Sequence, residues 1–482
     1  MMIAGKLVAG EGAPVTVRNP SSGEVTIEFA GASLDQTKSA IAAARAAADK
    51  GEWAAKPQKE RVAIVRDLLA RFTARHDDLR DLIVTETGMP IKSFALPAQV
   101  SAPLAQMETM LDLYMKLPEI EENPISLDER INNMGGFVQS IRRYVPVGVV
   151  AAISAYNFPL HINLWKLMPA LATGNCVILR PSPLTPMSAL ALAEIAAEAG
   201  LPEGVLSIIA ESGAEGAQLL TTDRHVDMVS FTGSTEVGSI VAGQAAPSMK
   251  RLQLELGGKS AQIYLPDRVE AAFSAAIGVC IAHAGQGCVL GTRIFVPEAE
   301  KAKVLGAMTA SMAYLKIGDS TNPETTMGPV ISEAQAQRCE RYVKLAVEAG
   351  ASVVAGGKRA DRPGYFFEPT ILDVPDNKNP SAQDEIFGPV VSVIGYRDVE
   401  HAIEMANDSS LGLSGYVYGK DARAALDVAK RIRTGTINVN AFFASANSSS
   451  GGVKMSGIGR ERGVEGIRAF QDVQVMNLGS AV

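Results

Sequence analysis

The chain has 482 residues, of which 47% are hydrophobic and 20% charged, enough to bury a large core without disulfides or metals. Its 45 lysines and arginines and 52 aspartates and glutamates give a net charge of −7, which disfavours binding to nucleic acid or to an anionic membrane surface. Four cysteines without a CxxC pair and five scattered histidines argue against a metal framework and favour a reduced, cytoplasmic setting.

The N-terminal part of the chain is predicted to be helical and to be followed by an isolated strand. From residue 34 to about 117, apolar residues recur every three or four positions, and we expect these helices to cover one face of a sheet. Residues 137–144 alternate between apolar and polar, which predicts a strand with one solvated face. The tail, residues 473–478, alternates again, so it should pair with that strand or with another subunit.

Two stretches of alternating strands and helices follow. The first has expected helices from about residues 160, 185, 214 and 235, and expected strands at 147–154, 176–179, 205–209 and 226–231. The second runs from 261 to about 437, with expected strands at 293–296, 390–396 and 436–440. This alternation predicts the α/β fold class with two doubly wound, mainly parallel sheets and a site in the crevice between them.

Two glycine-containing segments can bring the backbone close to a ligand. Gly233 and Gly238 lie at a strand-to-helix turn, where N–H groups can bind a phosphate, although packing alone would also explain them. Cys288 follows two glycines that end a helix. Of the other thiols, Cys176 and Cys280 lie in apolar runs typical of inert buried cysteines. Cys339 lies in a polar helix.

Two polar side chains stand at the ends of apolar strands. Glu255 is flanked by leucines, and burial would raise its pKa toward the range of a general base. An ion pair with Lys259 is the alternative. Asn157 follows another strand, where its amide can donate to an oxyanion or cap the next helix.

Taken together, these segments resemble the aldehyde dehydrogenase superfamily, and the resemblance extends from Asn19 to about Phe470. The matching segments are Tyr156-Asn-Phe-Pro159, Pro169-Ala-Leu-Ala-Thr-Gly-Asn175, Phe231-Thr-Gly-Ser-Thr235, Glu255-Leu-Gly-Gly-Lys259, Gly285-Gln-Gly-Cys288, Gly328-Pro329, Glu385-Ile-Phe-Gly-Pro389 and Lys454-Met-Ser-Gly-Ile-Gly-Arg-Glu461.

The resemblance implies a mechanism. Cys288 would attack an aldehyde, and the Asn157 amide and the Cys288 N–H would hold the oxyanion of the thiohemiacetal. Hydride transfer to a nicotinamide would leave a thioester, which water activated by Glu255 would hydrolyse. Lys166 and Glu461 match polar groups near the proton exit, although a purely structural salt bridge would also account for them.

The resemblance also implies where the cofactor binds. The expected cofactor-binding residues are Ser154, Ala155, Tyr156, Arg180, Ser182, Pro183, Phe231, Gly233, Ser234, Gly238, Leu256, Glu385 and Phe387. The family's usual Lys-Pro-Ser-Glu segment reads Arg180-Pro-Ser-Pro183 here, so the carboxylate that would repel a 2′-phosphate is missing. With a positive charge at Arg180 as well, we expect both NAD+ and NADP+ to be accepted.

Small residues replace the aromatic groups that often narrow the family's substrate tunnel. They are Ala282, Ala444 and Ser450, so we expect a medium, long-chain or aromatic aldehyde. The complete set of expected tunnel residues is Tyr114, Phe158, His161, Trp165, Ala282, Phe442, Ala444 and Ser450.

The family's architecture implies three parts. Residues 1–123 and 147–256 would bind the cofactor, 257–455 would form the catalytic domain, and 124–146 with 470–482 would form a small β oligomerisation element of a homodimer or homotetramer. Two other readings remain: an aldehyde dehydrogenase that passes the acyl group to coenzyme A, which Glu255 argues against, and a non-enzymatic dinucleotide-binding protein.

Overall fold

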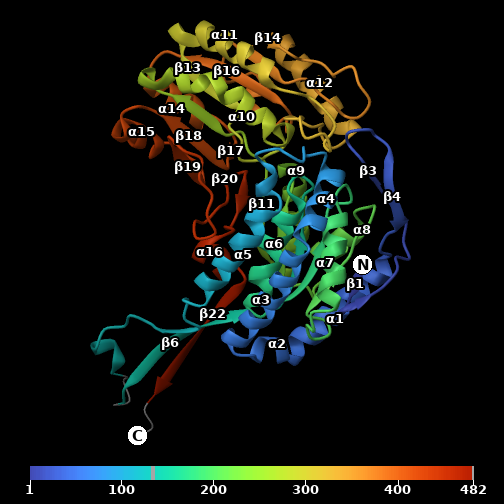
Figure 1. The fold of residues 1–482 in the computed structure, drawn as a ribbon. Helices are drawn as coiled ribbons and strands as arrows, with labels where there is room; N and C mark the ends of the chain where they lie inside the picture. Colours follow the sequence, from blue (N-terminus) through green and yellow to red (C-terminus); the bar gives the residue numbers. More distant parts are fainter. Residues whose placement is uncertain (132–135, 480–482) are drawn as a thin grey trace.

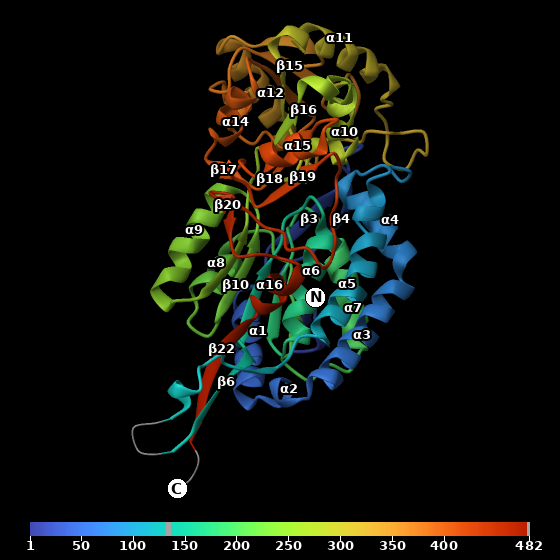
Figure 2. The ribbon, with the colours of Figure 1, turned by 90° about the vertical axis from the view of Figure 1, so that its left-hand side faces the viewer.

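The computed structural model describes residues 1–131 and 136–479, which form two α/β units stacked on one another and a projecting β arm (Figure 1). The turned view shows the second unit above the first and the arm extending away from both (Figure 2).

The first unit is built on an eight-stranded sheet whose centre is parallel. Its strands in spatial order are β2 (Lys6–Leu7), β1 (Met2–Ile3), β9 (Leu206–Ile208), β8 (Cys176–Arg180), β7 (Val149–Ile153), β10 (Met228–Thr232), β11 (Arg251–Glu255) and β21 (Gly457–Ile458). From β7 the chain proceeds outward to β8 and β9, then returns to place β10 and β11 on the other side. The carboxyl ends of β7 and β10 therefore flank a topological switch point, where ligands bind in such sheets.

Helices cover both faces of this sheet. One layer consists of α1 (Leu34–Lys50), α8 (Glu215–Thr222) and α9 (Thr235–Ala245). The other consists of α6 (Pro159–Ala172) and α7 (Met187–Ala197), and behind these lie α3 (Gln58–Ala74), α4 (His76–Thr87) and α5 (Ser101–Tyr114), with the short α2 (Glu52–Ala55) between α1 and α3. The expectation that all N-terminal helices lie on the sheet is thus wrong for α3 to α5, which pack on α6 and α7. Since α6 is enclosed between layers, all its residues except His161 are buried.

The second unit contains a seven-stranded sheet that is parallel except at β14. Its strands in spatial order are β14 (Ser352–Ala355), β15 (Thr370–Val374), β16 (Val390–Tyr396), β13 (Arg293–Pro297), β12 (Ala261–Tyr264), β18 (Ser414–Tyr418) and β19 (Thr436–Val439). Its helices are α10 (Ala275–Ile281), α11 (Lys301–Ser311), α12 (Glu333–Glu348), α13 (Pro380–Gln383), α14 (Val399–Asn407) and α15 (Ala422–Ala429).

Alternate residues of the central strands enter two separate cores. In β13, Ile294 and Val296 pack with α10 and α11, whereas Phe295 faces the core that includes α12, α14 and α15. Strands that are buried on both faces are apolar throughout, which explains why their positions are visible in the sequence. The two α/β units predicted from the sequence are confirmed.

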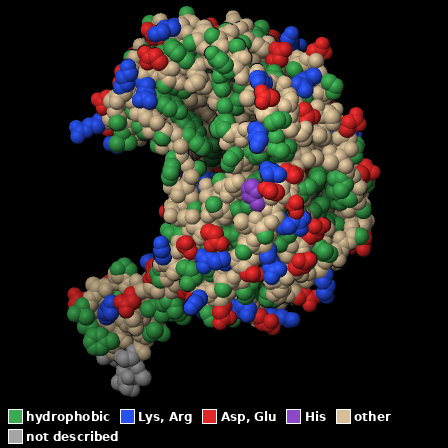
Figure 3. Space-filling view, viewed as in Figure 1, with side chains coloured by type: hydrophobic (Ala, Val, Ile, Leu, Met, Phe, Trp, Pro, Cys, Tyr) green, Lys and Arg blue, Asp and Glu red, His purple; other side chains and the backbone are tan. Residues whose placement is uncertain are grey.

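The arm is a three-stranded antiparallel sheet of β5 (Ile120–Glu122), β6 (Val138–Pro146) and β22 (Gln471–Gly479). Met476 lies opposite Ile141, so the predicted pairing of the tail with this strand is confirmed. Apolar side chains remain exposed on the arm, including Phe137, Val473 and Val475 (Figure 3). Residues 132–135 and 480–482 of the expected oligomerisation element lie outside the described residues.

Three short pairs complete the fold. They are the hairpin of β3 (Pro14–Arg18) and β4 (Val25–Ala30), the pair β17 (Leu411–Gly412) and β20 (Val453–Lys454), and the addition of β21 to the edge of the first sheet. After β20 the chain leaves the second unit, adds β21 beside β11 and continues through α16 (Gly463–Arg468) into the arm.

Candidate active site

The loop after α10 positions the Cys288 thiol. The chain turns sharply because His283, Ala284 and Gly285 all adopt positive φ angles, and a Cβ on Gly285 would lie 2.0 Å from the Gly388 carbonyl oxygen. Gly258 approaches from β11, where a Cβ would lie 2.1 Å from the Cys288 carbonyl oxygen. Cys288 itself is half-buried.

The Cys288 thiol is protonated at neutral pH in this environment. Burial raises its pKa to about 12, and the carboxylates of Glu385 and Glu255 add to the effect. A thiol of this kind must pass its proton to a base before it can attack an electrophile.

Asn157 reaches the same loop from the first unit. It is 4% exposed, and its Nδ2 donates to the Gln286 carbonyl oxygen at 3.0 Å. Its main-chain oxygen accepts a hydrogen bond from Gln99 Nε2 at 2.8 Å. The alternative role as a helix cap is not realised, because Phe158 occupies the N-cap of α6 and that helix has no side-chain cap. An amide carries two N–H donors, so one remains for a ligand beside Cys288.

Glu255 ends β11 and belongs to a cluster of ionisable groups. Burial and the nearby Glu461 carboxylate raise its pKa well above the ordinary value, while Lys166 acts in the opposite direction. Its Oε1 is buried and has no hydrogen-bond partner among the described residues. Lys166 Nζ donates to Glu461 Oε1 at 2.9 Å, and the ion pair considered with Lys259 is absent from the described part of the chain.

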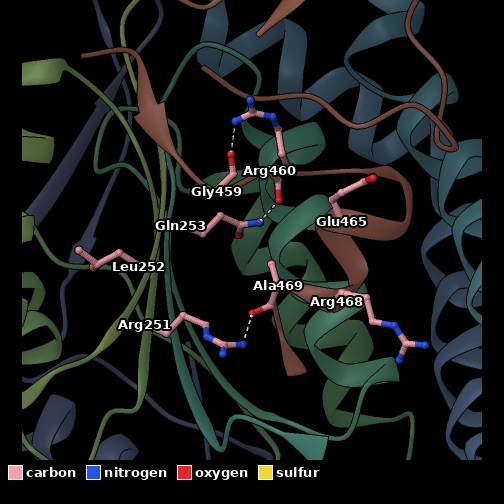
Figure 4. A pocket seen from close by; sticks show the side chains of 8 residues that line it. All are labelled: Arg251, Leu252, Gln253, Gly459, Arg460, Glu465, Arg468 and Ala469. Atoms are coloured by element: carbon pink, nitrogen blue, oxygen red, sulfur yellow. Dashed lines mark hydrogen bonds between the residues drawn. The ribbon is translucent and has the colours of Figure 1, made fainter. Parts of the chain in front are cut away.

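A chain of hydrogen bonds connects Lys166 to a surface hollow between β11 and α16. Lys166 Nζ donates to Ser230 Oγ at 3.0 Å, Ser230 Oγ donates to Gln253 Oε1 at 2.7 Å, and Gln253 Nε2 donates to the Arg460 carbonyl at 2.6 Å. The hollow has a volume of about 450 Å³, and Gln253 points toward the Arg460 main chain there, whereas the Arg460 side chain turns to the Gly459 carbonyl (Figure 4). Cys288 does not line this hollow, so it is separate from the thiol's crevice.

The switch point of the first sheet offers polar groups to a ligand. The hydroxyls of Ser154 and Thr232, at the ends of β7 and β10, are buried without a partner among the described residues. Ser234 caps α9 by accepting from Val237 N, and a Cβ on Gly233 would lie 2.4 Å from the Phe231 ring. This arrangement fits a dinucleotide whose phosphates lie at the N-terminus of α9.

Gly238 has a packing role, because a Cβ there would lie 2.3 Å from Leu256 Cδ2. The neighbouring residue Ala155 is half-buried at the end of β7.

Glu385 and Phe387 belong to the second unit and contact residues near the switch point of the first sheet. The Glu385 carboxylate accepts from Gly258 N at 2.8 Å, and burial raises its pKa to about 7. Phe387 adopts a positive φ of 62°, and its ring meets the Tyr156 ring edge-on at 5.9 Å. The expected cofactor-binding residues from both units therefore meet across the crevice.

Arg180 does not supply the free positive charge expected from the sequence. Its Nε donates to Glu211 Oε1 at 2.9 Å, and its other nitrogens donate to the carbonyls of Pro181 and Gly213. Both side chains of the pair are at least nine-tenths buried. Glu211 therefore neutralises Arg180 next to Ser182 and Pro183, which close the end of β8.

Phe158 and, through Tyr416, Phe442 are connected to the loop of Cys288, but Tyr114 is not. Phe158 contacts both His161 and His283 with edge-on rings at 6.3 and 6.0 Å. Tyr114 is 1% exposed and accepts from Arg61, which also donates to Ala172 O at the far end of α6. Because α6 separates this hydroxyl from Asn157, placing Tyr114 in the tunnel was wrong.

The remaining tunnel residues differ in exposure. Phe442 is 67% exposed and stacks on Tyr416, whereas Trp165 is 2% exposed. Ala282 is half-buried and Ala444 is exposed. Ser450 exchanges two backbone hydrogen bonds of 2.7 Å with Glu461.

Two residues were not recognised from the sequence. Arg462 lies with its guanidinium 5.2 Å from the Trp165 ring, and His283 is buried with an unpartnered Nε2. Their only sequence signal is adjacency to the Glu461 and Cys288 motifs. Cys339, expected in a polar helix, is fully buried because it lies on the inner face of α12.

Comparison with known proteins decides the family. The profile of the aldehyde dehydrogenase family matches residues 7–476. The chain belongs to this family. It is therefore an oxidoreductase that acts on aldehydes.

Three relatives cover nearly all of the chain. Geranial dehydrogenase of Castellaniella defragrans is 36% identical, over 90% of this chain and 88% of that protein. An aldehyde dehydrogenase of Mycobacterium tuberculosis, solved with NAD+, is 38% identical, with a TM-score of 0.92 and coverage of 98% and 96%. A mutant of aldehyde dehydrogenase C from Pseudomonas syringae, solved with NAD+ and octanal, is 32% identical, with a TM-score of 0.91 and coverage of 98% and 96%.

The described residues contain neither a metal-binding cluster nor a membrane-spanning helix. No group of three or more His, Cys, Asp and Glu side chains there could hold a metal ion. None of the described helices combines the length and apolar character required to cross a membrane.

Proposed function

We propose that this enzyme oxidises an aldehyde to the carboxylic acid with NAD(P)+ and water, through a covalent intermediate on Cys288. The observation that carries the proposal is the convergence of Cys288, Asn157 and Glu255 on one crevice from three separate elements. Their chemistry matches the three needs of the reaction: a nucleophile, an oxyanion donor and a base.

The steps follow from these side chains. Ionised Glu255 takes the Cys288 thiol proton and releases it to solvent, the Cys288 sulfur bonds to the aldehyde carbon, and the free Asn157 N–H donates to the resulting oxyanion. When bound, NAD+ supplies the two-electron acceptor that converts this thiohemiacetal to a thioester. Glu255 then takes a proton from water, the hydroxyl adds to the thioester carbon, and the thiol leaves as the acid forms. Lys166 favours the ionised form of Glu255 that this step requires.

We propose that the enzyme accepts both NAD+ and NADP+ and prefers NAD+. Ser154, Thr232, Gly233 and Ser234 would hold the dinucleotide at the switch point. The absence of a carboxylate at Pro183 leaves room for a 2′-phosphate. Because Glu211 neutralises Arg180, the pair attracts that phosphate only weakly. We therefore expect the kcat/KM values with NAD+ and NADP+ to differ by less than about 100-fold, or about 3 kcal/mol.

The substrate proposal is a medium, long-chain or aromatic aldehyde. The small side chains of Ala282, Ala444 and Ser450 leave space at the rim, and Phe158 and Phe442 offer apolar surface. The relatives named for geranial and solved with octanal are consistent with this size class.

The test of the mechanism is Glu255→Gln. Removing the base should block hydrolysis, so rapid mixing should give a burst of about one reduced cofactor per site and then slow turnover. Cys288→Ala should abolish both phases, whereas the control Cys280→Ala should keep them.

Two outcomes would contradict the proposal. Steady turnover of Glu255→Gln without a burst would remove the base assignment. A slow phase accelerated by coenzyme A but not by water would favour the acyl-transferring alternative.

We also propose that the chain forms a homodimer or homotetramer in the cytoplasm. The exposed apolar side chains of the arm, Val473 and Val475 among them, would be covered by another copy. Free cysteines throughout the chain suit a reducing compartment. In this proposal residues 1–123 and 147–256 form the cofactor-binding domain, residues 257–455 the catalytic domain, and the arm the oligomerisation element.

A further inference from the structure

Arg462 places a positive charge near the reacting thiol and has no direct ion pair among the described residues, although the Glu461 and Glu255 carboxylates act on it at longer range. It is half-buried at the N-cap of α16, with a positive φ of 61°. Burial lowers the pKa of its guanidinium, while the charges of Glu461, Glu255 and Cys288 act in the opposite direction. Among the described residues it forms no ion pair, and arginines removed from water are normally paired.

Neutral groups hold Arg462 in place. The guanidinium lies 5.2 Å from the Trp165 ring centroid, and its Nη2 is 2.6 Å from His161 Nε2. His161 Nδ1 lies 3.2 Å from the Ala98 carbonyl oxygen, so Nδ1 carries the proton and Nε2 accepts from Arg462. Burial and Arg462 lower the pKa of His161 to about 3, so this histidine stays neutral. These contacts fix the Arg462 side chain but leave its charge without a direct ion pair.

The other charges nearby are already engaged. Glu461 is paired with Lys166, and Arg460 donates to the carbonyls of Gly452 and Gly459. Glu255 has a raised pKa, so it is protonated over a wider pH range than an ordinary glutamate. With Glu255 protonated, Lys166 and Arg462 against Glu461 leave a net charge of about +1, and the four charges balance when Glu255 is ionised for its role as a base.

Arg462 packs on a face of α6 that also contacts the loop carrying Cys288. Phe158, His161 and Trp165 recur at three- and four-residue spacing and so share one face of α6. Phe158 packs against His283 in the loop that carries Cys288, and Trp165 packs against Arg462. The charges of Cys288 and Glu255 both act on Arg462, which places all three in one electrostatic environment.

We propose that Arg462 binds an anionic group of the substrate, so that the preferred substrate is an aldehyde that also carries a carboxylate. A guanidinium accepts a carboxylate in a bidentate fork, and a partly dry site strengthens such a pair. The inference rests on the proposed oxidation at Cys288 and narrows the substrate class within it.

The test compares two aldehydes of equal shape and different charge. 4-Carboxybenzaldehyde and 4-formylbenzamide should be oxidised by the wild-type enzyme with kcat/KM values that differ by at least about tenfold in favour of the carboxylate. Arg462→Gln should reduce this ratio to about one or below. Arg460→Gln removes the same charge two residues away, where the guanidinium donates to the Gly452 and Gly459 carbonyls. This control should keep the wild-type ratio of the two kcat/KM values. The pair 6-oxohexanoate and hexanal repeats the comparison with a flexible chain.

The alternative is that Arg462 only tunes Glu255 or Cys288. Arg462→Gln would then lower kcat/KM for both aldehydes equally and leave the ratio unchanged, which would overturn the inference, as would a wild-type ratio of one or below. If Arg462→Gln does not fold, the inference is tested by inhibition of hexanal oxidation in the wild-type enzyme. Benzoate should inhibit at a lower concentration than benzamide, and equal inhibition would overturn the inference. If no aldehyde is oxidised at all, the proposed function fails instead.

Discussion

The buried pair of Arg180 and Glu211 predicts how cofactor choice can be changed. Glu211 accepts from Arg180 Nε at 2.9 Å and from Gly216 N and Ala217 N at 2.8 and 2.9 Å. Glu211→Gln keeps an oxygen for some of these donors but removes the negative charge. Arg180 would then carry an unbalanced positive charge at the end of β8, where the adenine ribose is proposed to bind.

The magnitude follows from Coulomb's law. Unit charges about 6 Å apart at an effective dielectric constant of about 20 interact by about 3 kcal/mol, and screening at an open edge reduces this to about half. A gain of about 1.5 kcal/mol corresponds to about a tenfold rise in kcat/KM for NADP+ relative to NAD+.

The assay measures reduced cofactor with both dinucleotides and one aldehyde. Glu211→Gln should raise the NADP+/NAD+ ratio about tenfold, whereas Pro183→Glu should lower it by a similar factor. Glu215→Gln is the control, because that carboxylate is exposed on the first turn of α8, the helix whose first N–H groups donate to Glu211. A ratio unchanged by Glu211→Gln, or raised equally by Glu215→Gln, would refute the local pairing argument.

Two further predictions concern pH and size. Glu255 works as a base only when ionised, so activity should fall as pH drops through its raised pKa. Since Lys166 holds that pKa down, Lys166→Met should move the acid limb of the kcat profile to higher pH, and an unmoved limb would contradict this. In the wild type, kcat/KM should rise from propanal toward octanal by up to about fourfold per buried methylene. Ala444→Phe should flatten that rise, and an unaffected profile would exclude Ala444 from the substrate path.

In the first unit, the sequence predicted the central strands well and the edges poorly. In the second unit it predicted the edge strand Thr436–Val439 but not the interior strands Thr370–Val374 and Ser414–Tyr418. Strands such as Val149–Ile153 are buried on both faces, so hydrophobicity alone reveals them. The two-residue strands Met2–Ile3 and Gly457–Ile458 have no length in which a pattern can develop. Their places in the first sheet depend on the rest of the fold.

For the site, the sequence identified residue types but not electrostatic partners. Glu255 was recognised from its leucine neighbours, and its raised pKa follows from burial as expected. The partner of Arg180 is Glu211, 31 positions later in the chain. The two side chains meet because β8 and β9 are neighbours in the sheet, and the sequence does not show that order. Arg462 was missed because a charged residue in a charged segment normally faces solvent.

The late addition of β21 bears on how the chain is made. The edge of the first sheet at β11 is closed only by Gly457 and Ile458, about 200 residues after Glu255. At about 5–20 residues per second, a ribosome needs about 10–40 s to cover that distance. The sheet of the second unit is continuous from Ala261 to Val439 and can be completed first. During that interval β11 presents an unpaired edge of the kind that recruits foreign strands, so premature termination before residue 457 should yield aggregates.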